Sequence, residues 1–219
     1  MDAPLTDVEV RVLGSLIEKE YTTPDNYPLS LNALTAACNQ SSNRDPVLSL
    51  DESEVSATVH QLRGRGLVRP IVHSGGRVTK YEQRMDEALG LVRRQLAVLC
   101  VLMLRGPQTT GELRTRTQRI HDFAELDEVE STLDGLIDRE PPLVVRLPRR
   151  AGQKEIRYAH RLAGEISMDA LDARDAAAET TRAAPVSDRV AALEADVAAL
   201  REEMAALREE LAAFRRQFE

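Results

Sequence analysis

The segment that decides the fold is Asp51–Glu82, which reads DESEVSATVHQLRGRGLVRPIVHSGGRVTKYE. Asp51, followed three residues later by Glu54, forms a capping-box pattern, which predicts a helix from here to about Arg65. Two strand-like runs follow, and Ser-Gly-Gly at residues 74–76 predicts the turn between them. The predicted strands are Leu67–Val72 and Arg77–Glu82. A helix that leads directly into such a hairpin is typical of a winged-helix domain.

The same pattern returns about 75 residues later in the chain. The matching positions are Glu54, Val55, Thr58, Val59 and Leu62 in the first copy and Glu128, Val129, Thr132, Leu133 and Leu136 in the second. In the last strand of each copy, Lys80-Tyr81 corresponds to Arg157-Tyr158. The repeat predicts two winged-helix domains in tandem, at residues 1–85 and 86–162.

Earlier helices are expected in both copies from capping residues and apolar periodicity. In the first copy they are Thr6–Lys19 and Ser30–Cys38, and the connections at residues 20–28 and 39–46 are too polar and too interrupted to be elements. In the second copy the predicted elements are a helix containing Leu96–Leu104, helices Thr109–Arg116 and Leu126–Arg139, and strands Leu143–Leu147 and Glu155–Arg161.

The last part of the chain has a different character. Residues 163–187 contain few large apolar residues and are expected to form a flexible linker. Residues 188–219 carry apolar side chains at alternating spacings of three and four, which predicts a coiled coil. The dimerisation positions are Val190, Leu193, Val197, Leu200, Met204, Leu207, Leu211 and Phe214. Valine at a with leucine at d favours a parallel dimer. The alternative is a lone amphipathic helix folded back on its own domain.

Taken together, the sequence predicts a mainly α fold with small β-hairpins (α+β). Composition adds limits on function. The net charge of −7 is concentrated in residues 166–219, which carry 7 basic and 12 acidic groups, so neither winged-helix domain is basic overall. Cys38 and Cys100 both lie in apolar surroundings typical of core thiols. The N-terminus lacks a basic and apolar leader and no apolar run is long enough for a membrane span, so a cytoplasmic location without membrane contact is expected.

The sequence carries no motif of known catalytic chemistry. The four histidines are scattered, and none has a cysteine or carboxylate partner at metal-ligand spacing. There is no Gly-x-Ser-x-Gly, Walker loop or dinucleotide fingerprint, and residues 74–76 fit a hairpin turn better than a phosphate loop. We therefore expect a protein that is not an enzyme and that needs no cofactor.

The helix and wing of each copy supply the candidate nucleic-acid-binding residues. In the first copy they are His60, Gln61, Arg63 and Arg65, at the helix that begins at Asp51, and Arg77 and Lys80, in the wing. In the second copy they are Arg149, Arg150 and Lys154, near the tip of the wing. Glutamine can read adenine, and arginine can bind guanine or phosphate. The alternative is that these are ordinary solvated charges. In the second copy the corresponding helix is strongly acidic and should repel phosphate, with Glu125, Asp127, Glu128, Glu130, Asp134 and Asp138.

Several long strings make the chain resemble the YceH-like family of uncharacterised bacterial proteins. They are residues 22–30 (TTPDNYPLS), 38–40 (CNQ), 43–47 (NRDPV), 78–84 (VTKYEQR) and 105–109 (RGPQT). The resemblance implies tandem winged helices followed by a coiled-coil tail, and it implies no catalytic or ligand-binding residues. It draws attention to polar-loop candidates, for which a capped-loop scaffold is the alternative explanation: Asn32, Asn39, Gln40, Asn43 and Arg44.

Two hypotheses about function follow. The first is a coiled-coil homodimer that binds nucleic acid, with a regulatory role led by the first winged helix. The second is a protein-interaction scaffold, in which tandem winged helices clasp another chain as they do in condensin accessory subunits. The acidic helix of the second copy favours this second hypothesis.

Overall fold

The computed structural model describes residues 3–72, 78–149 and 155–166, and residues 1–165 make up one compact unit. Its mixture of helices and small antiparallel sheets confirms the predicted α+β class. Nearly all of the predicted linker and all of the predicted coiled coil lie outside the described residues. Among the residues that are described, no helix has the length and apolar character needed to cross a membrane.

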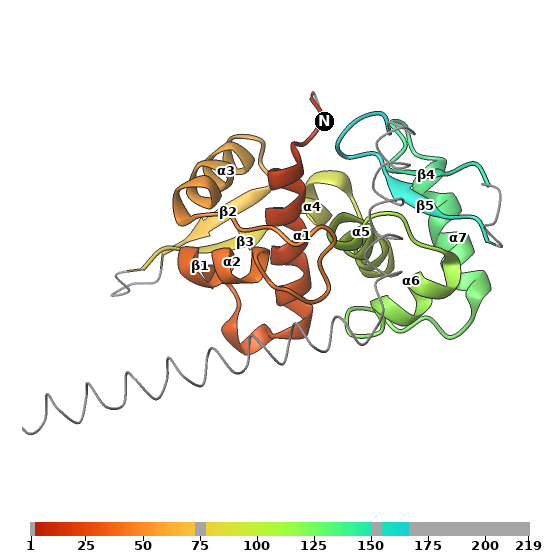
Figure 1. Cartoon of the computed structure of the whole chain (residues 1–219), viewed down its shortest axis with the longest axis horizontal. Coiled ribbons are helices and arrows are strands. Elements are labelled where there is room, and N and C mark those ends of the chain that lie inside the picture. The colour runs from red at the N-terminus through yellow and green to blue at the C-terminus, as the bar shows by residue number, and fades with distance from the viewer. Residues whose placement is uncertain (1–2, 73–77, 150–154, 167–219) are drawn as a thin grey trace, which may run out of the picture. The chain divides into compact units, whose positions relative to one another are not determined.

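The first half of the unit contains four α-helices and a three-stranded sheet (Figure 1). The elements are α1 Asp7–Thr22, the 3-10 helix η1 Pro24–Asn26, β1 Leu29–Ser30, α2 Leu31–Cys38, α3 Glu52–Gly64, β2 Val68–Ile71, β3 Lys80–Gln83 and α4 Met85–Leu89. The sheet is antiparallel with the order β1-β3-β2. The connection expected at residues 20–28 is thus shorter than predicted, because the Thr22 hydroxyl bonds back to the Glu18 carbonyl at 2.8 Å and α1 continues to Thr22.

The second half repeats this order with elements of equal or shorter length. They are α5 Arg93–Arg105, α6 Thr110–Thr117, α7 Leu126–Ile137, β4 Val144–Arg146 and β5 Tyr158–His160. Gln108, between α5 and α6, forms an isolated bridge with Tyr158. This bridge occupies the place of β1, where Leu29 pairs with Tyr81. The repeat also holds at the level of single hydrogen bonds, since Thr58 bonds to the Glu54 carbonyl at 2.8 Å and Thr132 bonds to the Glu128 carbonyl at 2.7 Å.

Helices begin where the sequence predicts them, because the capping boxes form. Thr6, Asp51 and Thr109 each accept a hydrogen bond from the backbone N–H three residues later, at 3.2, 2.8 and 3.2 Å. In each case the glutamate at that later position bonds back to the cap residue's own N–H. These reciprocal bonds satisfy two of the free donors at each helix start.

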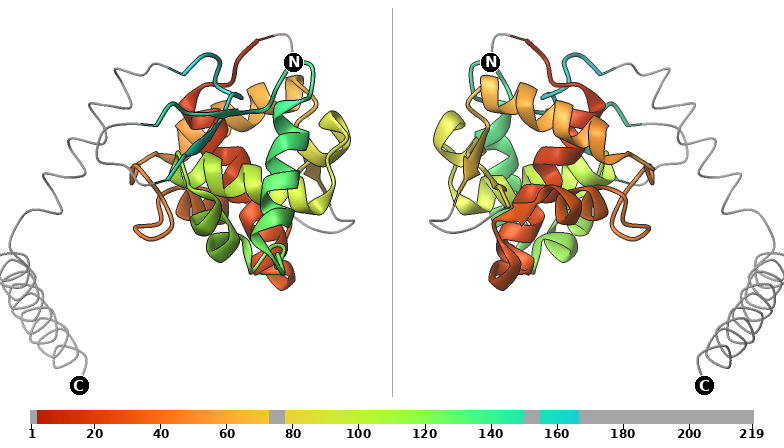
Figure 2. Two further views of the ribbon diagram at one scale, coloured as in Figure 1. Left: turned by 90° about the vertical axis from the view of Figure 1, so that its right-hand side faces the viewer. Right: turned by 90° about the vertical axis from the view of Figure 1, so that its left-hand side faces the viewer.

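The core is organised around α1 and α5, which pack against each other. Figure 1 shows α1 between α3 and α5. In Figure 2, the second half faces the viewer in the left-hand view and the first half faces the viewer in the right-hand view. Every residue from Glu9 to Ile17 in α1 and from Leu96 to Leu104 in α5 is buried. A helix buried over more than two consecutive turns is covered on all sides. The two halves therefore share one core.

Candidate nucleic-acid interface

Helix α3 presents one buried and one exposed face. Val55, Thr58, Val59 and Leu62 are buried against the core of the first half. The exposed face carries mainly short or uncharged side chains, at Ser53, Ser56, Ala57, His60 and Gln61. Short side chains let a helix backbone come close to another molecule, and histidine and glutamine add hydrogen-bonding groups to that face. This face therefore combines short side chains with exposed hydrogen-bonding groups.

The predicted helix residues divide into two groups. His60, Gln61 and Arg63 are all exposed on α3, as a reading helix requires. Arg65 instead binds the start of the chain: its Nη1 lies 3.2 Å from Glu9 Oε2, and its Nη2 donates to the Ala3 carbonyl. Glu9 is buried, so this pair joins the end of α3 to the beginning of α1. Arg65 acts as a structural residue and lies apart from the exposed face of α3.

The segment predicted to form the first wing is described only in part. Lys80 begins β3, where it is half-buried and pairs with Ser30 on one side and Ile71 on the other. Arg69 forms an ion pair with Glu82, its partner in the strand register, which uses part of the positive charge near the wing. Val72 and Val78, the described residues on either side of positions 73–77, are both exposed. Arg77 lies outside the described residues.

The polar loop before α3 is held together from the inside. The Arg44 side chain is fully buried, and its Nε and Nη2 donate to the Ala37 carbonyl at 3.1 and 2.9 Å. Arg11 donates to the neighbouring Cys38 carbonyl at 3.0 Å, so two arginines satisfy carbonyls at the C-terminus of α2. The Asn39 side chain bonds both the N–H and the carbonyl of Leu50, at 2.8 and 2.7 Å. These contacts support the capped-loop explanation.

Arg44 also forms a short ion pair with Glu18 of α1, with 2.6 Å between Nη2 and Oε2. Burial raises the pKa of Glu18, but the hydrogen bond and charge of Arg44 outweigh burial, and the pKa is lowered overall. Sequence reasoning did not single out Glu18 or Arg11. The sequence did contain one indication of a buried arginine, because Arg11 lies within the apolar part of the first helix and directly precedes Val12 and Leu13.

The remaining polar-loop candidates have different surroundings. Gln40 accepts a hydrogen bond from Arg44 at 3.1 Å, and Asn32 is exposed in the first turn of α2. Asn43 has a φ of 60°, a left-handed conformation that asparagine tolerates better than most residues. Its side-chain oxygen accepts a hydrogen bond from Arg105 at the end of α5. The loop thus connects the first half to the second.

The corresponding face in the second half is acidic, as the sequence predicts. The exposed carboxylates on and just before α7 are Glu125, Asp127, Glu128, Glu130, Asp134 and Asp138. Arg149 is exposed beyond β4, whereas Arg150 and Lys154 lie outside the described residues. The two halves share a fold but present helices of different charge.

The two cysteines lie in the interior of the protein. Cys38 and Cys100 are free and buried, which confirms them as core thiols. Burial raises the pKa of both thiols, so they remain protonated near neutral pH.

These observations define the structural class of the protein: it is a helical protein with small antiparallel sheets and one exposed polar helix. The chain belongs to the family described as "Protein of unknown function, DUF480", whose model matches residues 5–153. It is 56% identical over 170 residues to a UPF0502 protein of Pelobacter propionicus, covering 78% of this chain and 77% of that protein. It is 58% identical over 165 residues to a UPF0502 protein of Geotalea daltonii, covering 75% of each. The resemblance to an uncharacterised bacterial family is thereby confirmed.

Proposed function

We propose that this protein is a non-enzymatic winged-helix protein that binds nucleic acid through its first half and acts in regulation. Support comes from the order of elements, α1-β1-α2-α3-β2-β3 with the sheet order β1-β3-β2, which is the order of a winged helix. The second half repeats the order, with the Gln108–Tyr158 bridge in place of the first strand. In a winged helix, the third helix is the reading helix and the connection between the last two strands is the wing, so on this proposal α3 is the reading helix.

The observation that carries the proposal is the exposed face of α3. His60, Gln61 and Arg63 are exposed there, and the neighbouring Ser56 and Ala57 leave room for a base edge or a phosphate. Glutamine is suited to adenine and arginine to guanine or phosphate, which gives this face the chemistry of a major-groove reader. A parallel coiled coil formed by residues 188–219 would bring two such faces into one dimer.

The proposal is tested by measuring DNA binding of the full-length protein over a range of salt concentrations. Replacing Arg63 and Lys80 together by glutamate (R63E/K80E) should weaken binding at least tenfold. It should also reduce the slope of log K against log salt by about two, because each lost phosphate contact contributes roughly 0.9 to that slope. Gln61→Ala should instead change sequence preference with little effect on the slope.

A matched control carries the same change of net charge in the second half. Arg94, in the first turn of α5, and Arg161, directly after β5, lie outside the α3 face and the predicted first wing. R94E/R161E should therefore leave the affinity within about twofold. The proposal fails if the full-length protein shows no salt-sensitive DNA binding at micromolar concentration. It also fails if the control weakens binding as much as R63E/K80E.

The acidic face of α7 favours a second candidate function, a scaffold that binds a basic segment of another protein. Its exposed carboxylates include Asp134 and Asp138, and helix α7 itself contains no lysine or arginine. D134K/D138K should then release the partner in a pull-down, whereas D25K/D122K, an equal charge change at two other exposed aspartates, should retain it. Retention of every partner by D134K/D138K would exclude this face as the binding surface.

A further inference from the structure

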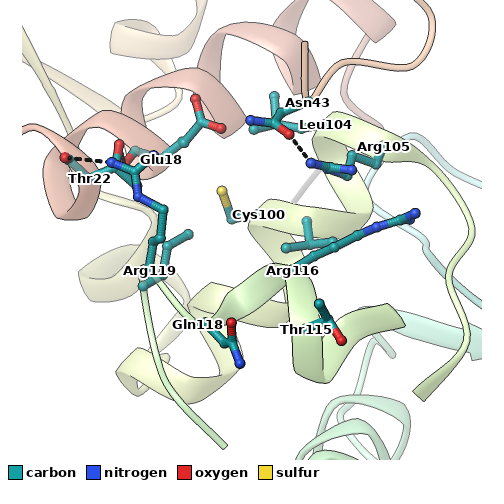
Figure 3. A pocket seen from close by; sticks show the side chains of 12 residues that line it. Glu18, Thr22, Asn43, Cys100, Leu104, Arg105, Thr115, Arg116, Gln118 and Arg119 are labelled. Atoms are coloured by element: carbon teal, nitrogen blue, oxygen red, sulfur yellow. Dashed lines mark hydrogen bonds between the residues drawn. The ribbon is translucent and has the colours of Figure 1, made fainter. Parts of the chain in front are cut away.

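A pocket of about 340 Å³ lies between the two halves of the compact unit, beside the α1–α5 contact (Figure 3). Glu18 and Thr22 of α1 line it from the first half, and residues of α5, α6 and the segment after α6 line it from the second. Its volume is at the lower end of the range for small-molecule sites, which suits a small ligand.

The inner wall of the pocket is apolar. It is formed by Cys100, Val101, Leu104 and Ile120, all of which are buried. Cys100 lies between Arg119 and Arg105 in Figure 3, and its sulfur is directed toward α1, where it donates to the Gly14 carbonyl at 3.5 Å. Burial raises the pKa of this thiol, so it stays neutral. An apolar wall of this kind binds a hydrocarbon group by removing it from water.

The rim of the pocket is positively charged. Arg119 lies on one side of the space in Figure 3 and Arg105 on the other, with Cys100 between them. The stem of Arg116 also lines the pocket, while its guanidinium binds Glu112 at 3.1 Å. Burial, followed by the nearby charge of Arg116, lowers the pKa of Arg105, whereas the charges of Glu18 and Glu112 raise it. An anion that bound Arg105 directly would stabilise its partly buried charge.

The two flanking arginines are bound to neutral oxygen atoms. Arg105 donates to the side-chain amide of Asn43, and Arg119 Nη2 donates to the Thr22 carbonyl at 3.2 Å. A carboxylate forms shorter and stronger hydrogen bonds with guanidinium groups than either neutral oxygen does. Both contacts join the second half to the first, so a ligand that drew these arginines to itself would alter the connection between the halves.

The negative charge of Glu18 limits which anions can bind in the pocket. Glu18 lines the same pocket, and Arg44, on its other side, lowers its pKa and keeps it ionised. A dianion such as a phosphate monoester would meet stronger repulsion from Glu18 than a singly charged group would. From the apolar wall, the two arginines and this carboxylate, we propose that the pocket binds a small monocarboxylate with an apolar body. The inference does not depend on nucleic-acid binding.

The experiment is isothermal titration of the full-length protein with octanoate as the probe. We expect saturable binding of one octanoate per chain, with 1-octanol and octyl phosphate each binding at least about tenfold more weakly. Arg105→Gln and Arg119→Gln should each weaken octanoate about tenfold, the effect of losing one charged hydrogen bond. Arg94→Gln, at an exposed arginine outside the pocket, should leave the affinity unchanged.

A second variant separates binding from folding. Thr115 is exposed on α6 and lines the pocket, so Thr115→Trp should fill its opening and abolish octanoate binding with little change in the thermal unfolding temperature. Absence of saturable octanoate binding at millimolar concentration would overturn the proposal. So would equal binding to the parent protein and to the three pocket variants. Octyl phosphate binding as tightly as octanoate would overturn the assignment to a monocarboxylate.

Discussion

The Cys100 thiol lies 3.5 Å from the carbonyl oxygen of Gly14, to which it donates where α5 crosses α1. Such a close approach of a side chain to the backbone of a neighbouring helix requires a small residue at the crossing. A Cβ atom added at Gly14 would lie 2.9 Å from Leu104 Cδ2 and 3.3 Å from Met103 Cβ, closer than carbon atoms normally approach. The contact between the two halves is therefore built around this glycine.

Replacing Gly14 by valine should destabilise the protein. Overpacking of a well-filled core costs about 1–3 kcal/mol, which exceeds the gain from removing a glycine from a helix. The free energy of unfolding in urea measures this change. Gly135 in α7 is the control, because a Cβ there meets nothing closer than Gln95 Nε2 at 3.7 Å, so Gly135→Ala should stabilise by about 0.5–1 kcal/mol. Gly14→Val at or above parental stability would contradict the tight crossing.

Arg44→Met should be strongly destabilising, by about 3–5 kcal/mol, because it breaks an ion pair whose arginine is fully buried and leaves the half-buried Glu18 with only the longer contact to Lys19 at 3.6 Å. It also leaves the Ala37 carbonyl without the two hydrogen bonds that Arg44 donates. Arg69→Met removes an ion pair in which the arginine side chain is 52% exposed, and it should cost less than about 1 kcal/mol. Chemical denaturation measures the free energy of unfolding of both variants. Equal decreases in this free energy would show that burial does not make the Arg44 ion pair more stabilising than the exposed one.

The pH dependence of stability should separate Glu18 from Glu20. The pKa of Glu18 is lowered in the folded state, so its stabilisation is present above the ordinary value of 4.5 and is lost as the pH falls through the folded pKa. The pKa of Glu20 is raised by burial, so stability falls as the pH rises from 4.5 to the folded pKa.

Two conservative variants test these opposite signs. Glu18→Gln should destabilise most near neutral pH and least in acid. Glu20→Gln keeps an oxygen for the 2.8 Å bond from Gln83, and relative to the parent it should gain stability as the pH rises. Unfolding free energies measured between about pH 3 and pH 7 give both curves. Parallel curves for the two variants would contradict the opposite pKa shifts.

Deletion of residues 186–219 should convert a dimer into a monomer. The heptad positions Val190, Leu193, Val197 and Leu200 supply the apolar seam on which this prediction depends. Sedimentation velocity of the full-length and shortened chains is the measurement. A full-length protein that sediments as a monomer would refute the coiled-coil dimer.

Local features were predictable because their causes are local. The capping residues Thr6, Asp51 and Thr109 mark helix starts through bonds that span three residues. Val55 and Leu62 reveal a buried face through helical periodicity alone. The internal repeat then related α3 to α7 and showed a difference in charge: the carboxylates of α3 lie at its start, at Asp51, Glu52 and Glu54, whereas those of α7 continue to its end at Asp138.

Features that depend on distant residues were not predictable in this way. Strand β1 is two residues long and exists because β3, some fifty residues later, supplies its partner. The buried position of Arg44 depends on Glu18 and on the end of α2. The run Leu96–Leu104 did hold a signal, since nine apolar residues in succession indicate a helix covered on all sides. The sequence alone did not identify α1 as the partner of that helix.

The shared core also has a consequence for synthesis on the ribosome. The side of α1 that contains Gly14 stays uncovered until α5, which ends at Arg105, has emerged. At about 5–20 residues per second, translation from the end of α1 to the end of α5 takes several seconds. During that time the nascent first half has an open apolar side. A ribosome that stalls between the two halves would therefore release a fragment prone to aggregation.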